Sequence, residues 1–188
     1  MPMRAAAPRA ACKKAVMNTY KNMVIRPTSL ADATAYRALR LEALRLHPTA
    51  FASDYVTDVN KPVEFWQQRL QLHEGKDMLL VAESQDALVG MCGIRRAEGV
   101  KYQHNATIWG VYVRAEWRGK GVAEALLKGC MAWAKDHAIT IVKLGVSTNN
   151  PSAIKFYLKC GFSIYGVEPL ALRVDGADLN EFLMARNL

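Results

Sequence analysis

Residues Arg118 to Ala123 read RGKGVA and place two glycines and two cations at the expected start of a helix. The first N–H groups of a helix have no partner within it, and the helix dipole favours negative charge there. Glycine lets the backbone come close to an anion, and the fork of an arginine binds two phosphate oxygens. These residue types at this spacing predict a pyrophosphate-binding site, with a solvated basic turn as the alternative.

The same segment does not fit two other nucleotide-binding motifs. A P-loop requires Gly-x4-Gly-Lys-Ser/Thr, but Lys120 is followed here by Gly121. A dinucleotide fingerprint requires three glycines as GxGxxG after an early strand, whereas the third position is Glu124 in a late loop. The sequence therefore excludes both motifs at this position.

Regular elements surround this loop. The run from Ala106 to Val113 is rich in β-branched and aromatic residues and predicts a strand, followed by a loop over Arg114 to Gly121. Residues Val122 to His137 repeat apolar side chains at three- and four-residue steps, which predicts an amphipathic helix. Ile141 to Ser147 alternates apolar and polar residues, which predicts the next strand. The loop thus joins a strand to a helix, as a phosphate site at a helix start requires.

Residues Asn150 to Phe162 read NPSAIKFYLKCGF and form a second segment of chemical interest. Asn150 before Pro151 is typical of a helix start, and Gly161 is typical of a helix end. The phenol of Tyr157 can donate a hydrogen bond to a developing anion such as a leaving thiolate. The alternative is that Tyr157 only packs as an aromatic residue on an amphipathic helix.

Together the two segments match the signature of a known superfamily. Residues Val113 to Leu127 read VRAEWRGKGVAEALL and follow the pattern V-x-P-x-x-R-G-x-G-x-G/A-x2-L-L. Ala115 replaces the usual proline, and Ala123 replaces the frequent glycine. The second pattern, N-x2-A-x3-Y-x3-G-F, is complete at Asn150, Ala153, Tyr157, Gly161 and Phe162. From about Met23 to Leu188 the chain resembles the GNAT superfamily of N-acetyltransferases.

The resemblance implies a GNAT-like acyl-CoA N-acyltransferase fold and transfer of acetyl from acetyl-CoA to an amine in a ternary complex. It implies that Arg118 to Ala123 bind the pyrophosphate and that backbone groups of Val111 and Val113 bind the pantetheine arm. Asn150 would contact that arm, and Tyr157 would be the general acid that protonates the departing thiolate. The cofactor-binding residues implied are Val111, Tyr112, Val113, Arg118, Gly119, Lys120, Gly121, Val122, Ala123 and Asn150.

The acceptor is less constrained, because a primary amine of a small molecule or of a protein fits equally well. Loops carry variable function, so we expect specificity to lie in the first helices and in the loop from His47 to Asn60. Four aromatic residues could line an amine pocket or belong to the core: Phe51, Tyr55, Trp66 and Trp109. Four residues have the chemistry of a general base, although each type is more common at the surface: Glu83, Glu98, His104 and Glu116. Water-mediated deprotonation is the alternative to a dedicated base.

The remaining pattern completes a mixed α/β (α+β) domain with the order β-α-α-β-β-β-α-β-α-β-β. A first strand covers Met23 to Arg26, and a first helix covers Leu30 to Leu46 after a cap at Thr28 or Ser29. This helix is expected to bury Tyr36, Leu39, Ala43 and Leu46. A second helix starts at Pro62 and is expected to bury Val63, Trp66 and Leu70. Two hairpins are expected, over Met78–Ala82 with Leu88–Arg95 and over Phe162–Val167 with Leu179–Met184, the latter turning at Asp175 and Gly176.

The chain of 188 residues has a net charge of +8, but the charge is uneven. Residues 1–22 hold five basic and no acidic residues, which leaves 20 basic against 17 acidic residues in the body. We expect residues 1–22 to be a disordered extension or the result of a start before Met17 or Met23, with a targeting segment as the alternative. The N-acetyltransferase domain then covers residues 23–188. The near-balanced body and the lack of a reader motif argue against nucleic-acid binding.

Other function classes are excluded by composition. The four cysteines and four histidines are scattered without metal-ligand spacing, so we expect no metal site and reduced thiols in a cytoplasmic protein. No apolar run approaches the ~18 residues that span a bilayer, so we expect no membrane partner. A homodimer is compatible with the sequence. The alternative function is a non-catalytic acyl-CoA-binding or regulatory domain with the same fold.

Overall fold

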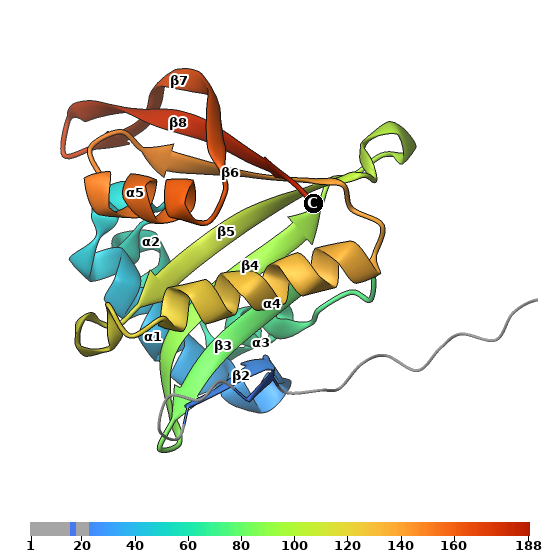
Figure 1. Ribbon diagram of the computed structural model, residues 1–188. Helices are drawn as coiled ribbons and strands as arrows, with labels where there is room; N and C mark the ends of the chain where they lie inside the picture. Colours follow the sequence, from blue (N-terminus) through green and yellow to red (C-terminus); the bar gives the residue numbers. More distant parts are fainter. Residues whose placement is uncertain (1–15, 18–22) are drawn as a thin grey trace, which may run out of the picture.

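The computed structural model describes residues 16–17 and 23–188, which build one twisted sheet with helices on both faces (Figure 1). Within these residues the strand order is β1-β2-β3-β4-β5-β6-β8-β7. β5 and β6 run parallel to each other, and the other neighbouring strands run antiparallel. The strands are β1 (Val16–Met17), β2 (Met23–Pro27), β3 (Asp77–Ser84), β4 (Ala87–Arg96), β5 (Asn105–Val113), β6 (Ile141–Ser147), β7 (Ser163–Val174) and β8 (Ala177–Asn187).

Two helical layers bury the two faces of the sheet. On one face, α4 (Val122–Asp136) and α5 (Pro151–Lys159) pack into a core built on β2 to β6. On the other face, α1 (Ala33–Leu46) and α3 (Val63–Leu70) form a second core with β3, β4 and β5, beside the short α2 (Tyr55–Val59). Figure 1 shows α4 in front of the sheet and α1 and α3 behind it. The sheet therefore separates the predicted phosphate loop side from the predicted acceptor side.

The predicted order of elements from Met23 onward is confirmed, with one short helix added. The segment His47 to Asn60 was expected to be a loop, but it contains the turn Pro48–Ala50 and α2. α2 forms because the side chain of Asp54 accepts a hydrogen bond of 2.7 Å from the N–H of Thr57, a helix cap that the pattern of apolar residues did not indicate.

Most predicted core positions are confirmed, and two are wrong. The apolar residues that recur at three- and four-residue steps in α4 are all buried: Val122, Leu126, Leu127, Cys130, Met131, Trp133 and Ala134. Tyr36, Leu39, Trp66 and Leu70 are buried as well. Leu46 is 55% exposed because it ends α1, and Val63 is 40% exposed because it lies in the first turn of α3 after Pro62. Terminal positions of a helix project past the face that its central turns bury.

The helix and turn signals around the second motif are confirmed. The side chain of Asn150 accepts a hydrogen bond of 3.1 Å from the N–H of Ala153, with Pro151 as the first residue of α5. Gly161 follows the helix at φ +84°, in the left-handed region that glycine adopts at little cost. Asp175 and Gly176 also have positive φ, at +50° and +80°, in the turn that joins β7 to β8.

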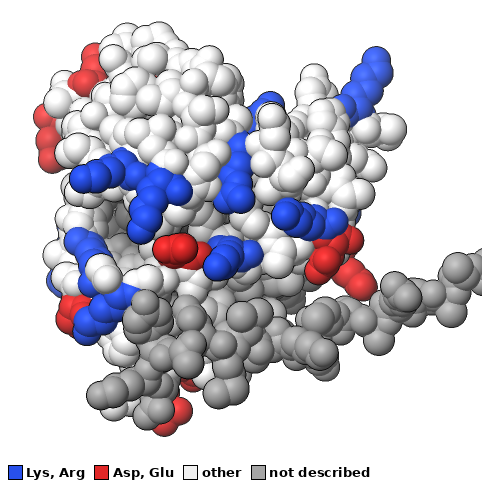
Figure 2. Space-filling model, viewed as in Figure 1, with Lys and Arg blue, Asp and Glu red and all other residues white. Residues whose placement is uncertain are grey.

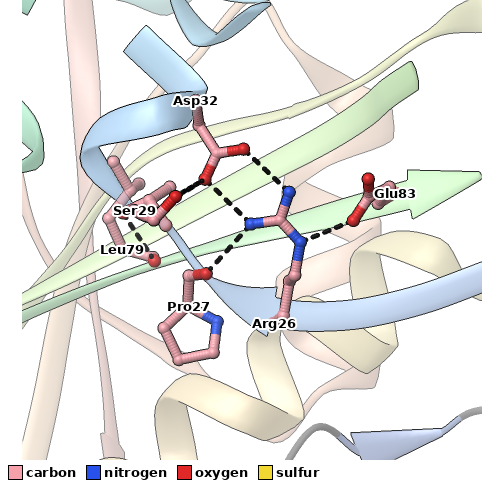
Figure 3. A network of polar contacts seen from close by, with 7 residues as sticks. Arg26, Pro27, Ser29, Asp32, Leu79 and Glu83 are labelled. Carbon is pink, nitrogen blue, oxygen red and sulfur yellow. Dashed lines mark hydrogen bonds and ion pairs between the residues drawn. The ribbon is translucent and has the colours of Figure 1, made fainter. Parts of the chain in front are cut away.

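The start of α1 is held by a network of charged groups around Arg26 on β2 (Figure 3). The N–H and hydroxyl of Ser29 donate to Asp32, which closes the predicted helix start as a turn over Leu30–Asp32. Arg26 donates to both carboxylate oxygens of Asp32 at 2.8 Å and to Glu83 at 2.5 Å. These hydrogen bonds hold the pKa of Asp32 down, at about 2. The network ties the first helix to β2 and β3.

Cys92 and Cys130 are buried free thiols, and Cys160 is half-buried. Cys12 and the predicted extension over residues 1–22, apart from Val16 and Met17, lie outside the described residues. In the part of the chain that is described, no helix is both long and apolar enough to cross a membrane.

Candidate active site

The parallel pair β5 and β6 separates soon after it begins. Residues Asn105–Thr107 pair with Ile141–Lys143, and no further pair joins the two strands in the described residues. Beyond this point β5 continues beside β4 to Val113, and β6 continues beside β8 to Ser147. Figure 1 shows the two strands diverging toward the loop before α4. Backbone groups along the facing edges are thus available to an extended ligand, as in other cases of strand-like binding.

A bulge interrupts β5 where it has left β6. Trp109 pairs with Gly93 and Tyr112 with Met91, so β5 has one extra residue at this point. Gly110 lies in the bulge with φ +64°. Such bulges re-aim side chains and are common beside active sites.

The bulge sets which face each side chain of β5 reaches. Val111 and Val113 pack into the core with α4. Trp109 and Tyr112 instead pack into the core with α1 and α3. Val111 and Val113, whose backbone is predicted to bind the cofactor arm, thus lie on the part of β5 from which side chains reach both faces of the sheet.

The predicted phosphate loop has the backbone shape that anion binding requires. Gly119 and Gly121 have φ of +72° and +77°, and no atom would lie within 4 Å of a Cβ added at Gly119. α4 begins at Val122, and no side chain caps it. Its first N–H groups therefore have no acceptor within the helix and no capping side chain. This geometry fits a diphosphate group.

The two cations of the loop have different surroundings. Arg118 donates from Nε to the carbonyl of Val113 at 2.9 Å and lies 2.8 Å from Nε2 of His47. Burial and the charge of Arg118 lower the pKa of His47, which favours the neutral imidazole as acceptor. Lys120 is exposed, and its ammonium lies 5.1 Å from the ring centre of Trp117. Arg118 thus shapes the loop, while Lys120 is the freer cation.

A second contact joins α1 to the same loop. The Tyr112 hydroxyl donates to Glu42 at 2.8 Å, and Arg114 forms an ion pair with the same carboxylate at 2.9 Å. Burial and then the bond to Glu42 raise the pKa of Tyr112 to about 12. The Tyr112 side chain is therefore a link between layers. Sequence reasoning missed Glu42 and His47, because each lies about 70 residues from its partner and belongs to no motif.

Tyr157 lies on α5 and is 7% exposed. Its ring packs against Phe156 and Phe162, with centres 5.2 and 5.8 Å away. Burial raises the pKa of Tyr157 well above its ordinary value, so the phenol keeps its proton and can act only as a donor of it. The amide oxygen of Asn150 already accepts from Ala153, so its cap role is structural.

None of the four candidate bases is a buried carboxylate or imidazole beside the bulge. Glu83 lies on β3, two strands from β5, and pairs with Arg26 of β2. Glu98 and His104 are exposed before the start of β5, at the opposite end from Gly110. Glu116 is exposed in the turn before the phosphate loop.

The aromatic residues proposed for an amine pocket divide into two groups. Trp66 is fully buried and packs edge-on against Tyr36, so it belongs to the core. Trp109 is partly buried, and Gly93 leaves room for its indole, since an added Cβ would lie 2.2 Å from the ring. Phe51 and Tyr55 are partly buried around the same core. These three residues therefore pack on the α1 and α3 face of the sheet.

A groove of about 600 Å³ runs between α4 and α5 on the opposite face. Figure 2 shows several Lys and Arg side chains on this face, with acidic side chains among them, and Glu124 also lines the groove. Its floor is apolar at Leu127, Met131 and Phe156, and its basic lining residues are Lys128, Lys135, Lys159 and Arg186. The groove begins at the first turn of α4, beside the phosphate loop.

The comparisons with known proteins agree with this geometry. A family model described as the acetyltransferase (GNAT) family matches residues 40–162. The chain belongs to the GNAT family. A member of this family is an acyltransferase that uses acetyl-CoA, as the two sequence motifs predicted.

This GNAT protein is similar in sequence to two relatives and in fold to one solved structure. It is 32% identical to the L-amino acid N-acetyltransferase of Escherichia coli, over 83% of this chain and 94% of that protein. It is 27% identical to an uncharacterized N-acetyltransferase of Methanocaldococcus jannaschii, over 80% of this chain but only 66% of that longer relative. An acetyltransferase from Salmonella typhimurium solved with acetyl-CoA shares the fold, with a TM-score of 0.75 and 22% identity over 89% of this chain and 95% of that one.

Proposed function

We propose that this GNAT protein transfers the acetyl group of acetyl-CoA to a primary amine, by direct attack within a ternary complex. The observation that carries the proposal is the separation of β5 from β6 beside the uncapped start of α4. It gives an extended thioester ligand a backbone edge at one end and an anion site at the other.

The residues present fit acetyl-CoA. The N–H groups of Gly119 to Ala123 bind the pyrophosphate, with Lys120 adding charge. Backbone groups of Val111 and Val113 hold the pantetheine arm along β5. The basic groove between α4 and α5 lies next to the pyrophosphate site and suits the remaining phosphate of the cofactor.

The chemistry needs an oxyanion donor and a proton for the leaving sulfur. The neutral amine nitrogen forms a bond to the thioester carbon, and the C–S bond then breaks as the electron pair moves to sulfur. A backbone N–H at the bulge in β5 stabilises the oxyanion. Tyr157 hydrogen-bonds the developing thiolate and passes its proton to the sulfur, while the amine proton leaves to water or to a base and the phenolate is reprotonated from solvent.

A binding assay and a turnover assay test the proposal together. Acetyl-CoA at 100 times its Kd is expected to stabilise the protein by about 2.7 kcal/mol in thermal unfolding. Release of free thiol is then measured across a panel of primary amines. Stabilisation without turnover on any amine would instead support the non-catalytic acyl-CoA-binding function.

A further inference from the structure

Arg40 on α1 is a buried cation without an ion pair. The residue is 4% exposed, and its Nε and Nη1 atoms have no hydrogen-bond partner among the described residues. Its Nη2 makes one long contact of 3.4 Å with the hydroxyl of Ser53, and its guanidinium lies over the ring of Phe51 at 4.6 Å. Asp58 is buried nearby with its Oδ2 atom also lacking a hydrogen-bond partner, and its charge raises the pKa of Arg40, yet no ion pair joins the two side chains in the described chain.

A second cation makes this environment more unusual. Arg69 on α3 also has an Nε atom that is buried without a partner, and its guanidinium lies 5.9 Å from the ring centre of Trp109. Burial and the charge of Arg69 both lower the pKa of Arg40. The indole N–H of Trp109 is buried and unpartnered as well. Unpaired buried charge is costly, and natural proteins normally satisfy it.

The cluster lies at the bulge in β5. Nη1 of Arg40 is 3.7 Å from the position that a Cβ of Gly110 would occupy. The next residue along the strand is Val111, whose backbone we assign to the cofactor arm. The free donors of Arg40 are thus held on the α1 side of the strand that carries the thioester in the proposed complex.

We infer that Arg40, supported by Arg69, binds a carboxylate of the acceptor, so that the substrate class is an amine that carries a carboxylate, such as an α-amino acid. The inference rests on the proposed function. A carboxylate would receive the free N–H donors and neutralise the buried charge. Polycationic acceptors are disfavoured, because like charge would be added next to the buried Arg40 and the partly buried Arg69.

Matched substrates test this inference on the intact enzyme. The common L-amino acids are assayed by thiol release, and each one that reacts is compared with its amide and with its decarboxylated amine. The carboxylate is expected to raise kcat/KM by roughly 10- to 100-fold over both neutral analogues. Equal or faster turnover of the amides and amines would overturn the inference while leaving the proposed function intact.

Variants of α1 assign the effect to the residue. Arg40→Gln is expected to lower kcat/KM for the amino acid roughly 10- to 100-fold and to leave its amide within about threefold. Arg45→Gln, at an exposed position of the same helix, is the control and should change neither. An unchanged preference for the carboxylate in Arg40→Gln would overturn the assignment.

Two further measurements keep the outcomes distinct. Stabilisation of Arg40→Gln by acetyl-CoA in thermal unfolding would show that the variant is folded. If the variant does not fold, the comparison of acid, amide and amine on the wild-type enzyme tests the preference for a carboxylate. Cofactor binding without turnover of any acid, amide or amine would overturn the proposed function and this inference with it.

Discussion

The side chain of Tyr157 is almost completely buried, and in the proposed mechanism its hydroxyl donates a proton to the leaving thiolate. Tyr157→Phe is expected to lower kcat by roughly 10²-fold at saturating acetyl-CoA, because the thiolate loses its proton donor. The ring contacts with Phe156 and Phe162 are retained, so cofactor binding and thermal stability should change little. Thiol release under saturating conditions measures the effect.

The control for this variant is Tyr165→Phe, which removes a hydroxyl from an exposed tyrosine on β7 and should leave kcat unchanged. Since burial holds the pKa of Tyr157 above about 10, its ionisation should not reduce kcat up to that pH. A wild-type rate for Tyr157→Phe would mean that the residue serves packing alone.

At the scale of elements, local signals were strong enough to predict most of the fold. Caps, left-handed glycines and apolar periodicity are properties of neighbouring residues, and Asn150 and Gly161 show how well they work. The bulge at Gly110 was not predicted, because a glycine within an apolar strand has the same local pattern with or without an extra residue. The helix cap at Asp54 was missed for a similar reason, in a segment without periodicity.

The loop before α4 can be tested with a pair of glycines in matched conformations. Gly119 and Gly176 both have positive φ, and neither would place an added Cβ within 4 Å of another atom. Alanine at either position costs about 1 kcal/mol of conformational energy. Only Gly119→Ala, however, places a methyl group at the proposed pyrophosphate site, so we expect about a tenfold higher KM for acetyl-CoA.

Steady-state kinetics and thermal unfolding of the two variants separate the two effects. Equal losses of stability with a changed KM in Gly119→Ala alone are expected. A similar KM in both variants would place the pyrophosphate elsewhere.

At the scale of the whole molecule, the sheet separates the proposed cofactor side from the proposed acceptor side, except where β5 leaves β6. The α4 and α5 side offers an anion site and a basic groove, and the α1 and α3 side offers the buried Arg40. The role of Arg40 could not be predicted from the sequence. Its spacing from Tyr36 and Ala43 places it on the apolar face of the helix, but an arginine at such a position can extend its charged end to solvent. Only the tertiary structure shows that this face is covered by the segment from Phe51 to Ser53.

The charged network at the start of α1 links this architecture to acid stability. Arg26 and Ser29 lower the pKa of Asp32 from its ordinary 3.8 to about 2. A depressed pKa stabilises the fold above pH 4, and this contribution is lost as pH falls from about 4 to about 2.

Asp32→Asn should therefore lower the free energy of unfolding by about 1–2 kcal/mol at pH 7, allowing for solvent screening, and by much less near pH 2. Urea unfolding across this pH range measures the difference, with Asp175→Asn in the exposed β7–β8 turn as control, expected to stay within about 0.5 kcal/mol of wild type. A loss in Asp32→Asn that is the same at every pH would show that shape rather than charge makes the contribution.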